Sequence, residues 1–389
     1  MLGSNPKATA PRILFGVTIS YQLRYHDGLY QNLVADGWDV HVASSPGERL
    51  ARLGDLAGVT IHPVPTEQQP KPRADLSSLR TWHRLIRRVR PRVVVIGTPK
   101  AGLLGLMAAF FARVPHRIYE LHGLRLETAH GPGRRFLRIM EWVTCHLATQ
   151  VIAVGPSLRA RAIEARVVAP SRIRTLGPGS PNGVDVDHFA HARSEASSVE
   201  ALRASLGLRP GIPVVAFIGR VTADKGIDIL ADALCMIRMR LPDLDILIVG
   251  GIEDPSGTLG LSHIQASGYH VVYAGQVSDT APYLAISDVL CLPSLREGLP
   301  TIVLEAFAAG VPVVATAATG ITDLVSEGRT GFLATVGNAP SLAHALNRAL
   351  TQPKSADQCA QAARLLVSSH YDGAIVRQRW QTTLAHLLE

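Results

Sequence analysis

Residues 289–316 read VLCLPSLREGLPTIVLEAFAAGVPVVAT, and they give the clearest indication of the fold class. Residues 289–292 form an apolar run, a short loop follows, residues 301–310 have the composition of a helix, and a second apolar run covers 313–315. A strand, a crossover helix and another strand in this order predict parallel pairing within one sheet. We therefore expect an α/β fold built around this unit.

The same alternation continues over the whole chain in two series. In the first half, strands are expected at 13–17, 39–43, 59–64, 93–96, 117–119, 151–154 and 173–176. In the second half, they are expected at 214–218, 245–249, 270–274, 289–292 and 313–315. Each series is long enough for one doubly wound sheet, so the sequence predicts two such domains.

The segment between the two series has the composition of a hinge. Residues 177–197 are rich in Gly, Pro, Asn, Asp and Ser, which are turn-forming residues. We expect an N-terminal domain at 1–189 and a C-terminal domain at 190–370. A last helix is expected at 371–389, where Val376, Trp380 and Leu384 recur at helical spacing, and its apolar face should pack back on the N-terminal domain.

Composition supports a folded, two-domain chain. The 389 residues are 47% hydrophobic and 18% charged, which is not the composition of a disordered protein. The longest apolar run, at 101–112, is shorter than the roughly 20 residues that a membrane-spanning helix needs, so we expect a buried helix there. Residues 1–10 are polar and lack the apolar segment of a secretion signal, which predicts a cytoplasmic protein. The cysteines lack paired or metal-type spacing and are expected to be reduced and structural; they are Cys145, Cys235, Cys291 and Cys359.

Positive charge is concentrated in the first half of the chain. Residues 1–190 hold 25 Lys and Arg against 13 Asp and Glu, a net charge of +12, whereas the remainder has a net charge of −4. Such a field favours an anionic partner, for example an acidic lipid, a phosphorylated substrate or a nucleic acid. An alternative is a codon bias toward arginine that has no functional meaning.

Two loops after expected strands of the second domain carry the candidate chemistry, because ligands of open α/β sheets bind at the carboxyl ends of strands. The first, GRVTADKG at 219–226, places Arg220 and Lys225 between a strand and a helix start. Cations beside a helix N-terminus predict a site for an anion such as a pyrophosphate; the alternative is a solvated loop. The sequence does not form a Walker loop, and no G-x-G-x-x-G dinucleotide motif follows a strand.

The second loop, PSLREGLP at 293–300, introduces two carboxylates. Glu297 follows the strand, and Glu305 lies about two turns into the next helix. One carboxylate can face a transferred group, and the other can accept hydrogen bonds from two adjacent ribose hydroxyls. Gly298 allows close approach of the backbone, and the N–H groups at the helix start add donors.

The motif Glu297-x7-Glu305 within this stretch resembles retaining glycosyltransferase family 4. It is preceded by GRVTADKG at 219–226 and followed by GITDLVSEGRTGFL at 320–333. The match is close over about 177–335 and looser in the first half. It implies a GT-B fold, in which two Rossmann-like doubly wound domains face each other across a cleft. Enzymes of capsule, O-antigen and lipid-linked oligosaccharide assembly are the most similar in motif.

The resemblance also implies roles for individual residues. The implied catalytic residues are Glu297, His122, Arg220 and Lys225. The implied donor-binding residues are Gly16, Gly219, Arg220, Lys225, Glu297, Gly298, Leu299, Pro300, Thr301 and Glu305. His122 is similar to a family histidine that reaches the donor sugar across the cleft, although a structural histidine is the alternative. The family's retaining step is viewed as front-face displacement, which needs no enzyme nucleophile.

No cofactor is expected beyond the donor substrate, a nucleotide sugar with UDP as the expected nucleotide, and no metal site is expected. The D-x-D patterns at 185–187 and 243–245 lie in the hinge and at the start of a strand, so we expect them to be structural.

Two basic clusters suggest a membrane-bound acceptor. They are Arg134, Arg135 and Arg138, and Arg84, Arg87, Arg88, Arg90 and Arg92. The resemblance implies a polyprenyl-diphosphate-linked saccharide as acceptor, because the basic N-terminal domain of such relatives often lies against the inner membrane. We expect this chain to do the same, as a peripheral protein on the inner face of the plasma membrane held by charge and exposed apolar residues, with no nucleic-acid partner. A soluble natural-product acceptor is the alternative within the same chemistry. A nucleotide-sugar epimerase is the alternative from another class.

Overall fold

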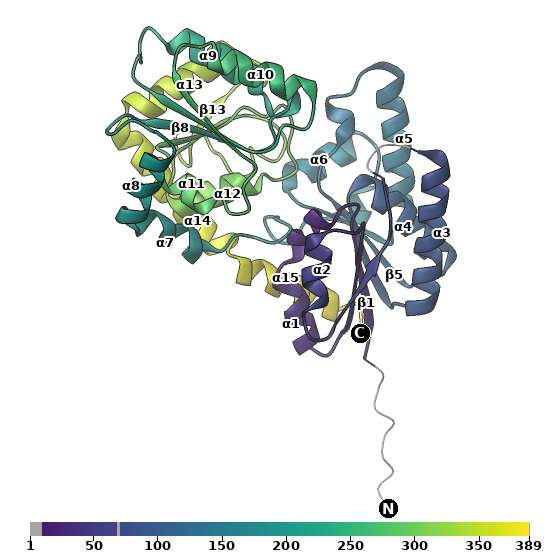
Figure 1. Ribbon diagram of the computed structural model, residues 1–389. Helices are drawn as coiled ribbons and strands as arrows, with labels where there is room; N and C mark the ends of the chain where they lie inside the picture. The colour runs from purple at the N-terminus through teal and green to yellow at the C-terminus, as the bar shows by residue number, and fades with distance from the viewer. Residues whose placement is uncertain (1–9, 68–70, 389) are drawn as a thin grey trace, which may run out of the picture. The chain divides into compact units, whose positions relative to one another are not determined.

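The computed structural model describes residues 10–67 and 71–388, and its chain forms two compact units (Figure 1). Unit 1 comprises Met1–Val154, Arg159–Asn182 and Arg377–Glu389, and unit 2 comprises Gly155–Leu158 and Gly183–Val376. Each unit is built on one parallel sheet. The segment 1–9, on which most of the argument against a secretion signal rested, lies outside the described residues.

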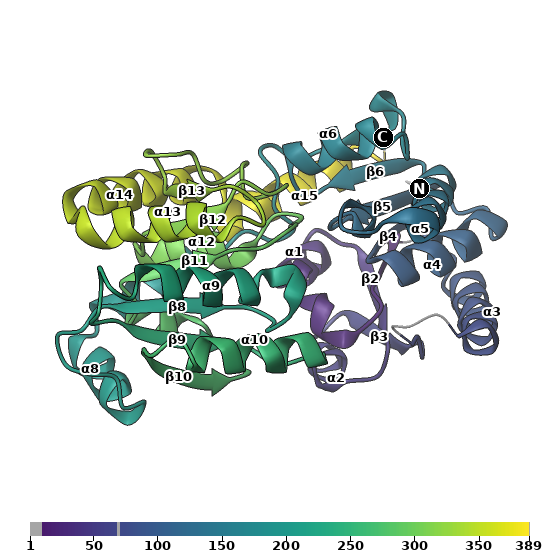
Figure 2. The same cartoon turned by 90° about the horizontal axis from the view of Figure 1, so that it is seen from above.

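Unit 1 has a seven-stranded sheet in the order β3-β2-β1-β4-β5-β6-β7. Its strands are β1 (Arg12–Gly16), β2 (Asp39–Ser44), β3 (Val59–Pro63), β4 (Val93–Gly97), β5 (His116–Leu121), β6 (Gln150–Ala153) and β7 (Ile173–Arg174). Its helices are α1 (Leu29–Ala35), α2 (Glu48–Gly54), α3 (Pro72–Val89), α4 (Pro99–Phe111) and α5 (Gly131–Leu147), with the 3-10 segments η1 (Ser20–His26), η2 (Arg125–Glu127) and η3 (Pro170–Arg172). Helix α6 (Pro156–Glu164) begins in unit 2 and continues in unit 1. Helices α3, α4 and α5 lie side by side (Figures 1 and 2).

Unit 2 has a six-stranded sheet in the order β10-β9-β8-β11-β12-β13. Its strands are β8 (Val214–Ile218), β9 (Asp245–Val249), β10 (His270–Gly275), β11 (Val289–Leu292), β12 (Val313–Thr316) and β13 (Phe332–Ala334). Its helices are α7 (Val186–Ser194), α8 (Ala196–Ser205), α9 (Ile227–Ile237), α10 (Pro255–Gln265), α11 (Ala281–Ala285), α12 (Thr301–Ala309), α13 (Ala339–Thr351) and α14 (Pro353–His370), with η4 (Ala223–Lys225). Helix α15 (Gly373–Ala385) starts in this unit and ends in unit 1.

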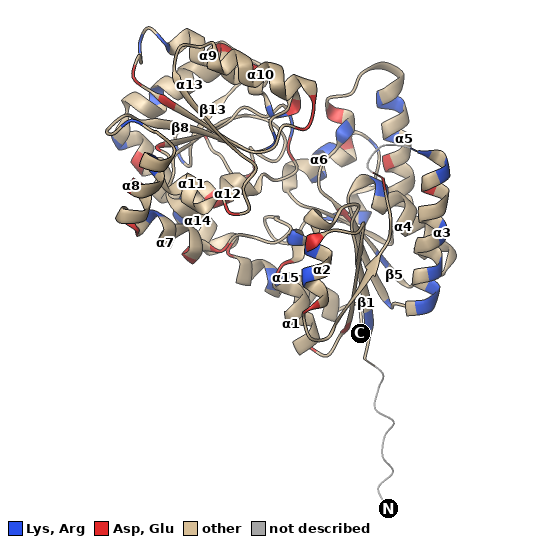
Figure 3. Cartoon of the chain, in the orientation of Figure 1, with Lys and Arg blue, Asp and Glu red and all other residues tan. Residues whose placement is uncertain are grey.

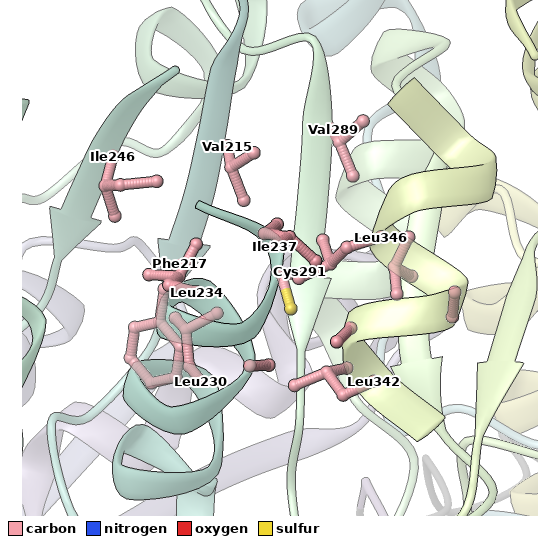
Figure 4. Packing of buried hydrophobic residues seen from close by; sticks show 14 of the residues in the cluster. Val215, Phe217, Leu230, Leu234, Ile237, Ile246, Val289, Cys291, Leu342 and Leu346 are labelled. Carbon is pink, nitrogen blue, oxygen red and sulfur yellow. The ribbon is translucent and has the colours of Figure 1, made fainter. Parts of the chain in front are cut away.

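The core of unit 2 shows why its central strands are continuous apolar runs. Val215 and Phe217 of β8 pack with Leu234 of α9 and Leu342 of α13, all fully buried (Figure 4). Parallel strands covered by helices on both faces have no solvent side, so apolar residues do not alternate with polar ones. This composition explains why the expected strands of both series are confirmed to within a few residues.

Two expectations about the chain's organisation are wrong in detail. The chain enters unit 2 after Asn182, not after residue 189, and most of the expected hinge after Asp185 is helical. Asp185 accepts a hydrogen bond from the backbone N–H of His188 and so caps α7, whose Phe189 is buried. Helix α7 packs on α11 and α12, which places it in unit 2.

Strand β13 was missed because its three residues are too few for a periodic signal.

The end of the chain packs on unit 1, as expected. From Arg377 onward α15 belongs to this unit, whereas its first four residues belong to unit 2. The Trp380 indole donates a hydrogen bond to the Pro181 carbonyl at 3.1 Å, and its ring lies edge-on to His26 with the centroids 5.6 Å apart.

Two sequence expectations about apolar segments and cysteines can be compared with the structure. Within the described chain, every helix falls short of the length and apolarity needed to cross a bilayer. Most of helix α4, the expected buried helix, is buried, but Phe110 and Phe111 at its end are exposed. All four cysteines are free, and Cys235 alone among them is exposed.

Candidate functional site

The loop after β8 is shaped by a glycine that contacts the loop after β11. Gly226 ends η4 with φ of +74° and precedes α9. A Cβ atom at this position would lie 2.1 Å from the Pro293 carbonyl oxygen, so a side chain would collide with backbone. The two loops therefore approach each other as closely as their backbones allow.

Polar contacts also join these two loops. The Leu295 backbone N–H donates to the Asp224 carbonyl at 2.9 Å, and the Arg296 guanidinium pairs with the Asp224 carboxylate at 3.2 Å. Both loops follow central, adjacent strands of the sheet, at the carboxyl ends where such folds bind ligands. The sequence segments at 219–226 and 293–300 thus form one structural feature.

Lys225 and Glu297 meet across this junction. The Lys225 Nζ lies 2.5 Å from Glu297 Oε1, and the Ser294 hydroxyl donates to the same oxygen at 2.7 Å. Both charged side chains are mostly buried, with 17% and 10% of their side-chain surface exposed. Thr316 at the end of β12 donates to the Ser294 carbonyl and holds that residue in place.

Arg220 lies in the same loop but pairs with other carboxylates. Its guanidinium is 3.3 Å from Asp224 and 2.9 Å from Glu253, and nearly half of its side-chain surface is exposed. Burial raises the pKa of Asp224, but the Thr222 hydroxyl and the nearby cations lower it by more, so the net shift of the pKa is downward. Asp224 therefore bridges Arg220 and Arg296 as a carboxylate.

Charges at this junction balance. The cations Arg220, Lys225 and Arg296 are matched by three carboxylates, which are Asp224, Glu253 and Glu297. An anionic ligand would thus find cations that are already positioned and would compete with carboxylates for them. The junction can therefore bind an anion, and its carboxylates can pair with the same cations again when the anion leaves.

The remaining expected residues of unit 2 lie on or before α12. Gly298, Leu299 and Pro300 are buried, and Thr301 is the first residue of the helix. Glu305 lies one turn further and not two turns into the helix as expected, because α12 begins only at Thr301; it accepts a hydrogen bond from Thr280 at 2.7 Å. No side chain caps this helix start, so its first N–H groups can serve as donors to a ligand.

A second glycine supports the loop that contains Gly298. Gly320 has φ of +78°, and a Cβ there would lie 2.2 Å from the Gly298 carbonyl oxygen. The Gly320 N–H donates to the Ser157 hydroxyl at 2.7 Å, and Asp323 accepts hydrogen bonds from the Ser157 hydroxyl and N–H. The stretch at 318–323 therefore fixes segment 155–158 and the loop at 298.

Two expected residues belong to unit 1. Gly16 is the buried last residue of β1, where a Cβ would lie 2.6 Å from the Trp82 ring, so packing alone requires a small residue. His122 follows β5 and stacks on Tyr25 with ring centroids 4.5 Å apart. Its Nε2 lies 3.1 Å from the carboxylate of Glu120.

Both D-x-D patterns have structural roles. Asp185 caps α7, as described above. Asp245 is fully buried in β9. Its carboxylate accepts two hydrogen bonds from Arg209, one from the backbone N–H and one from Nε, each at 2.7 Å. In the part of the chain that the structure describes, no group of three His, Cys, Asp or Glu residues is arranged to hold a metal ion.

Several polar residues of the site were not identified from the sequence. Ser294, Asp224 and Arg296 stand inside the quoted motifs, but their partners become visible only when the two loops are placed together. Thr280 precedes α11, where the sequence gives no signal for a contact with Glu305.

Comparisons with known proteins agree with this architecture. The family described as "Glycosyl transferases group 1" matches residues 198–366, and the "Glycosyl transferase 4-like domain" matches residues 23–179. The capsular polysaccharide biosynthesis glycosyltransferase CapM of Staphylococcus aureus is 30% identical over 372 residues, which cover 94% of each chain. An Escherichia coli UDP-Gal:alpha-D-GlcNAc-diphosphoundecaprenol alpha-1,3-galactosyltransferase is 28% identical, with 70% of each chain covered. HepE of Anabaena, solved in complex with UDP-glucose, has the same fold with a TM-score of 0.79 at 22% identity, covering 96% of this chain and 99% of that one.

Proposed function

Because this chain belongs to the group 1 glycosyltransferases and has the GT-B fold, we propose that it transfers a hexosyl or N-acetylhexosaminyl group from a UDP-sugar to an acceptor hydroxyl. The nucleotide sugar is assigned to unit 2 and the acceptor to unit 1. The new bond is proposed to keep the anomeric configuration of the donor.

The observation that carries this proposal is the junction of the loops at 219–226 and 293–300. It places Lys225 beside Glu297 and Arg220 within the same charge network, next to an uncapped helix start. A diphosphate needs cations and N–H donors, and a sugar needs a fixed carboxylate for its hydroxyls. The two requirements meet at the carboxyl ends of β8 and β11.

In the proposed reaction, Arg220 and Lys225 bind the diphosphate. The bond between the anomeric carbon and the diphosphate oxygen breaks, and the acceptor oxygen bonds to the same carbon from the same face. The acceptor proton passes to the departing diphosphate oxygen. The cations stabilise the charge that develops there, while Glu297 faces the sugar and Glu305 the ribose. His122 is assigned to the donor sugar by the family resemblance.

A thermal-shift screen against a panel of nucleotide sugars tests the donor. A ligand that binds only the folded state raises its melting temperature, so the correct donor and UDP should both raise it. Incubation of the protein with the selected nucleotide sugar alone then separates two classes of enzyme. A nucleotide-sugar epimerase would convert the sugar without an acceptor, and that result would contradict the proposal.

The transfer is proposed to need no metal, because prearranged cations and a helix terminus can stabilise the leaving diphosphate. Turnover of the wild-type protein in EDTA, with and without added Mg²⁺ or Mn²⁺, tests this. Loss of turnover in EDTA that a divalent ion restores would contradict it.

The proposed acceptor is a polyprenyl-diphosphate-linked saccharide at the cytoplasmic face of the plasma membrane. The E. coli relative is named for such an acceptor, and CapM for capsule synthesis. NMR of the product made from a lipid-linked acceptor would report both acceptor use and anomeric configuration. Transfer only to soluble acceptors would favour the natural-product alternative.

The surface of helices α3, α4 and α5, here called the α3–α5 face, supports a membrane location. Six of the seven exposed large apolar residues described in unit 1 lie there, namely Leu76, Phe110, Phe111, Phe136, Ile139 and Trp142. Exposed arginines stand between them on α3 and α5 (Figure 3). The acidic residues of these two helices are engaged elsewhere, since Asp75 pairs with Lys100 and Glu141 with Tyr119.

The ends of α3 and α4 add a basic pocket to this face. It has a volume of about 520 Å³ and is lined by four arginines, which are Arg87, Arg90, Arg92 and Arg113. Exposed aromatic residues beside cations are typical of a surface that binds an anionic bilayer. We assign this face to the membrane.

Co-sedimentation with vesicles tests the assignment. The protein should bind vesicles that contain anionic phosphatidylglycerol at low salt and should not bind neutral phosphatidylcholine vesicles. Arg134→Ala combined with Trp142→Ala should reduce the binding at least fivefold. Arg329→Ala combined with Arg364→Ala, on exposed positions of unit 2, serves as the control. Equal binding by both variants would contradict the assignment.

A further inference from the structure

Unit 1 contains a fully buried carboxylate next to the expected catalytic histidine. Glu120 lies in β5, two residues before His122, and none of its surface is exposed. Burying an ionised carboxylate is costly unless charged or hydrogen-bonding partners compensate it. Its partners are two histidines, because the Nε2 atoms of His26 and His122 both lie 3.1 Å from Glu120 Oε2.

The carboxylate is ionised in this setting. Burial raises the pKa of Glu120, but the nearby charges of His26 and His122 outweigh burial and lower the pKa to about 2. Neither 3.1 Å contact is aligned as a hydrogen bond, but a carboxylate this close favours the imidazole form that carries its proton on the facing Nε2. By its charge, Glu120 therefore favours a proton on the Nε2 of each ring.

The two histidines differ in their surroundings. His26 is buried among the rings of Phe15, Tyr30 and Trp380, so it is the structural end of the network. His122 keeps 15% of its side-chain surface exposed and is the end that reaches solvent. The network thus connects a fixed histidine to an accessible one through a single carboxylate oxygen.

The His122 ring is held on three sides. Glu120 engages Nε2, the Tyr25 ring stacks on one face, and Gly97 leaves the space that the ring occupies. A Cβ atom on Gly97 would lie 2.8 Å from His122 Nε2 and 3.5 Å from Glu120 Oε2. Across the described residues, no hydrogen bond holds His122 Nδ1, which leaves this nitrogen for a ligand.

We propose that Glu120 is a positioning residue for His122: its carboxylate lies against Nε2, favours a proton there, and so leaves Nδ1 to face the donor sugar in one orientation. This proposal rests on the proposed function, because it assigns Glu120 a task in sugar transfer. Carboxylates that orient a catalytic imidazole commonly act in this way, by fixing the tautomer and stabilising the protonated ring. A purely structural role for Glu120 is the competing explanation.

Glu120→Gln keeps the size of the side chain and removes its charge. We expect kcat to fall about tenfold to hundredfold while the affinity for UDP, measured by calorimetry, stays within twofold, because the proposed nucleotide site lies in unit 2. Glu141→Gln is the matched control, since Glu141 is another carboxylate of unit 1 that bonds to Tyr119 and does not touch His122. It should leave kcat within twofold of the wild-type value.

A double-mutant cycle separates positioning from structural support. If Glu120 acts through His122, then Glu120→Gln should reduce kcat by less than threefold in a His122→Ala background. A loss in that background as large as in the wild type would overturn the proposal. Should Glu120→Gln fail to fold, Gly97→Ala takes its place in the cycle, because it crowds His122 Nε2 without changing any charge.

A measurement independent of activity distinguishes failure of this inference from failure of the proposed function. Nitrogen-15 spectra of the histidine rings, assigned by comparison with His122→Ala, report which ring nitrogen carries the proton. In the wild type the His122 signals should show a protonated Nε2, and they should shift in Glu120→Gln but not in Glu141→Gln. Unchanged His122 signals in Glu120→Gln would overturn the inference even in an active enzyme. If no nucleotide sugar is turned over, the proposed function fails while the spectra still decide whether Glu120 sets the proton position.

Discussion

The Glu297 carboxylate contacts two partners, Lys225 and Ser294, so a substitution that removes its charge changes the state of a neighbouring cation. Its Oε1 atom is engaged by Lys225 and by Ser294, so the carboxylate both neutralises a cation and is held rigidly. A diphosphate at this junction would compete with Glu297 for Lys225. Loss of the Glu297 charge should therefore release Lys225 for the anion and, at the same time, remove the group assigned to the sugar.

The two glutamates are predicted to differ in which step they affect. Glu297→Gln should lower kcat at least a hundredfold and leave the Kd for UDP unchanged or lower. Glu305→Gln should raise the Kd for UDP about tenfold, since a charged acceptor for ribose hydroxyls is lost, and reduce kcat less than tenfold. Calorimetry and steady-state kinetics measure the two effects, with Glu200→Gln on exposed α8 as the control. Equal and small effects of both substitutions would show that the site is misplaced.

Sequence reasoning identified the ionic residues of this junction but not how they are paired. Arg220, Lys225 and Glu297 follow strands in recognisable motifs. The pairing of Lys225 with Glu297, 72 positions apart, depends on the adjacency of β8 and β11 and on the close approach at Gly226. The roles proposed for these residues stay predictions until the variants are measured.

At the scale of elements, glycines determine how closely the loops of unit 2 pack. Gly320 has a positive φ, and its Cα faces the Gly298 carbonyl. Gly320→Ala should lower the free energy of unfolding by about 2–4 kcal/mol, because the new methyl group adds a backbone collision to the strain at positive φ. It should also weaken UDP binding by displacing the loop at 298–301.

Gly328→Ala is the matched control for that prediction. Gly328 has φ of +66°, but a Cβ there would meet no atom within 4 Å, so only backbone strain of about 1 kcal/mol is expected. Urea denaturation gives both stabilities, and calorimetry gives both UDP affinities. An equal loss of stability in the two variants would mean that Gly320 does not support the loop.

Helix α5 is bonded to β5 by a carboxyl group with an unusual pKa. Burial raises the pKa of Glu141 to about 7, against the lowering effect of the Tyr119 hydroxyl that donates to it at 2.8 Å. Its ordinary pKa is 4.5, so between about pH 4.5 and 7 the folded chain holds more protons here than the unfolded chain. This group therefore makes the protein less stable as the pH rises through that window.

Glu141→Gln should remove this pH dependence. Relative to the wild type, the variant should gain stability between pH 5 and pH 8, by no more than about 3 kcal/mol. Urea denaturation of both proteins at the two pH values measures the change, and the difference between the proteins cancels the effects of other titrating groups. A difference that does not vary with pH would contradict a raised pKa at Glu141.

At the scale of the whole molecule, the order of elements could be predicted, but the division of the chain between the units could not. Apolar runs such as 245–249 mark buried strands wherever they occur. The assignment of α7 to unit 2 depends instead on the burial of Phe189 and on the packing of α7 against α11 and α12. Likewise, Gly183 has φ of +73° and packs on the backbone at 371–373, a contact between distant segments that composition does not reveal.

Unit 1 is assembled from separate pieces of chain, and its last piece brings a large buried side chain. Trp380 is 1% exposed and bonds to the Pro181 carbonyl, so the end of α15 completes this unit after all of unit 2 has been synthesised. Replacing a buried tryptophan with alanine typically costs about 3–5 kcal/mol. Trp380→Ala should thus destabilise unit 1 selectively.

Thermal unfolding with and without UDP can test this selectivity. We expect two transitions, of which UDP raises only the one that belongs to unit 2, because the proposed nucleotide site lies there. Trp380→Ala should lower the other transition by several degrees and leave the UDP-sensitive one within about 1 °C. Leu365→Ala, at a position that is 71% exposed on α14, should shift neither. If Trp380→Ala lowered both transitions equally, the end of α15 would stabilise the two units together, and unit 1 would not be an independent cooperative structure.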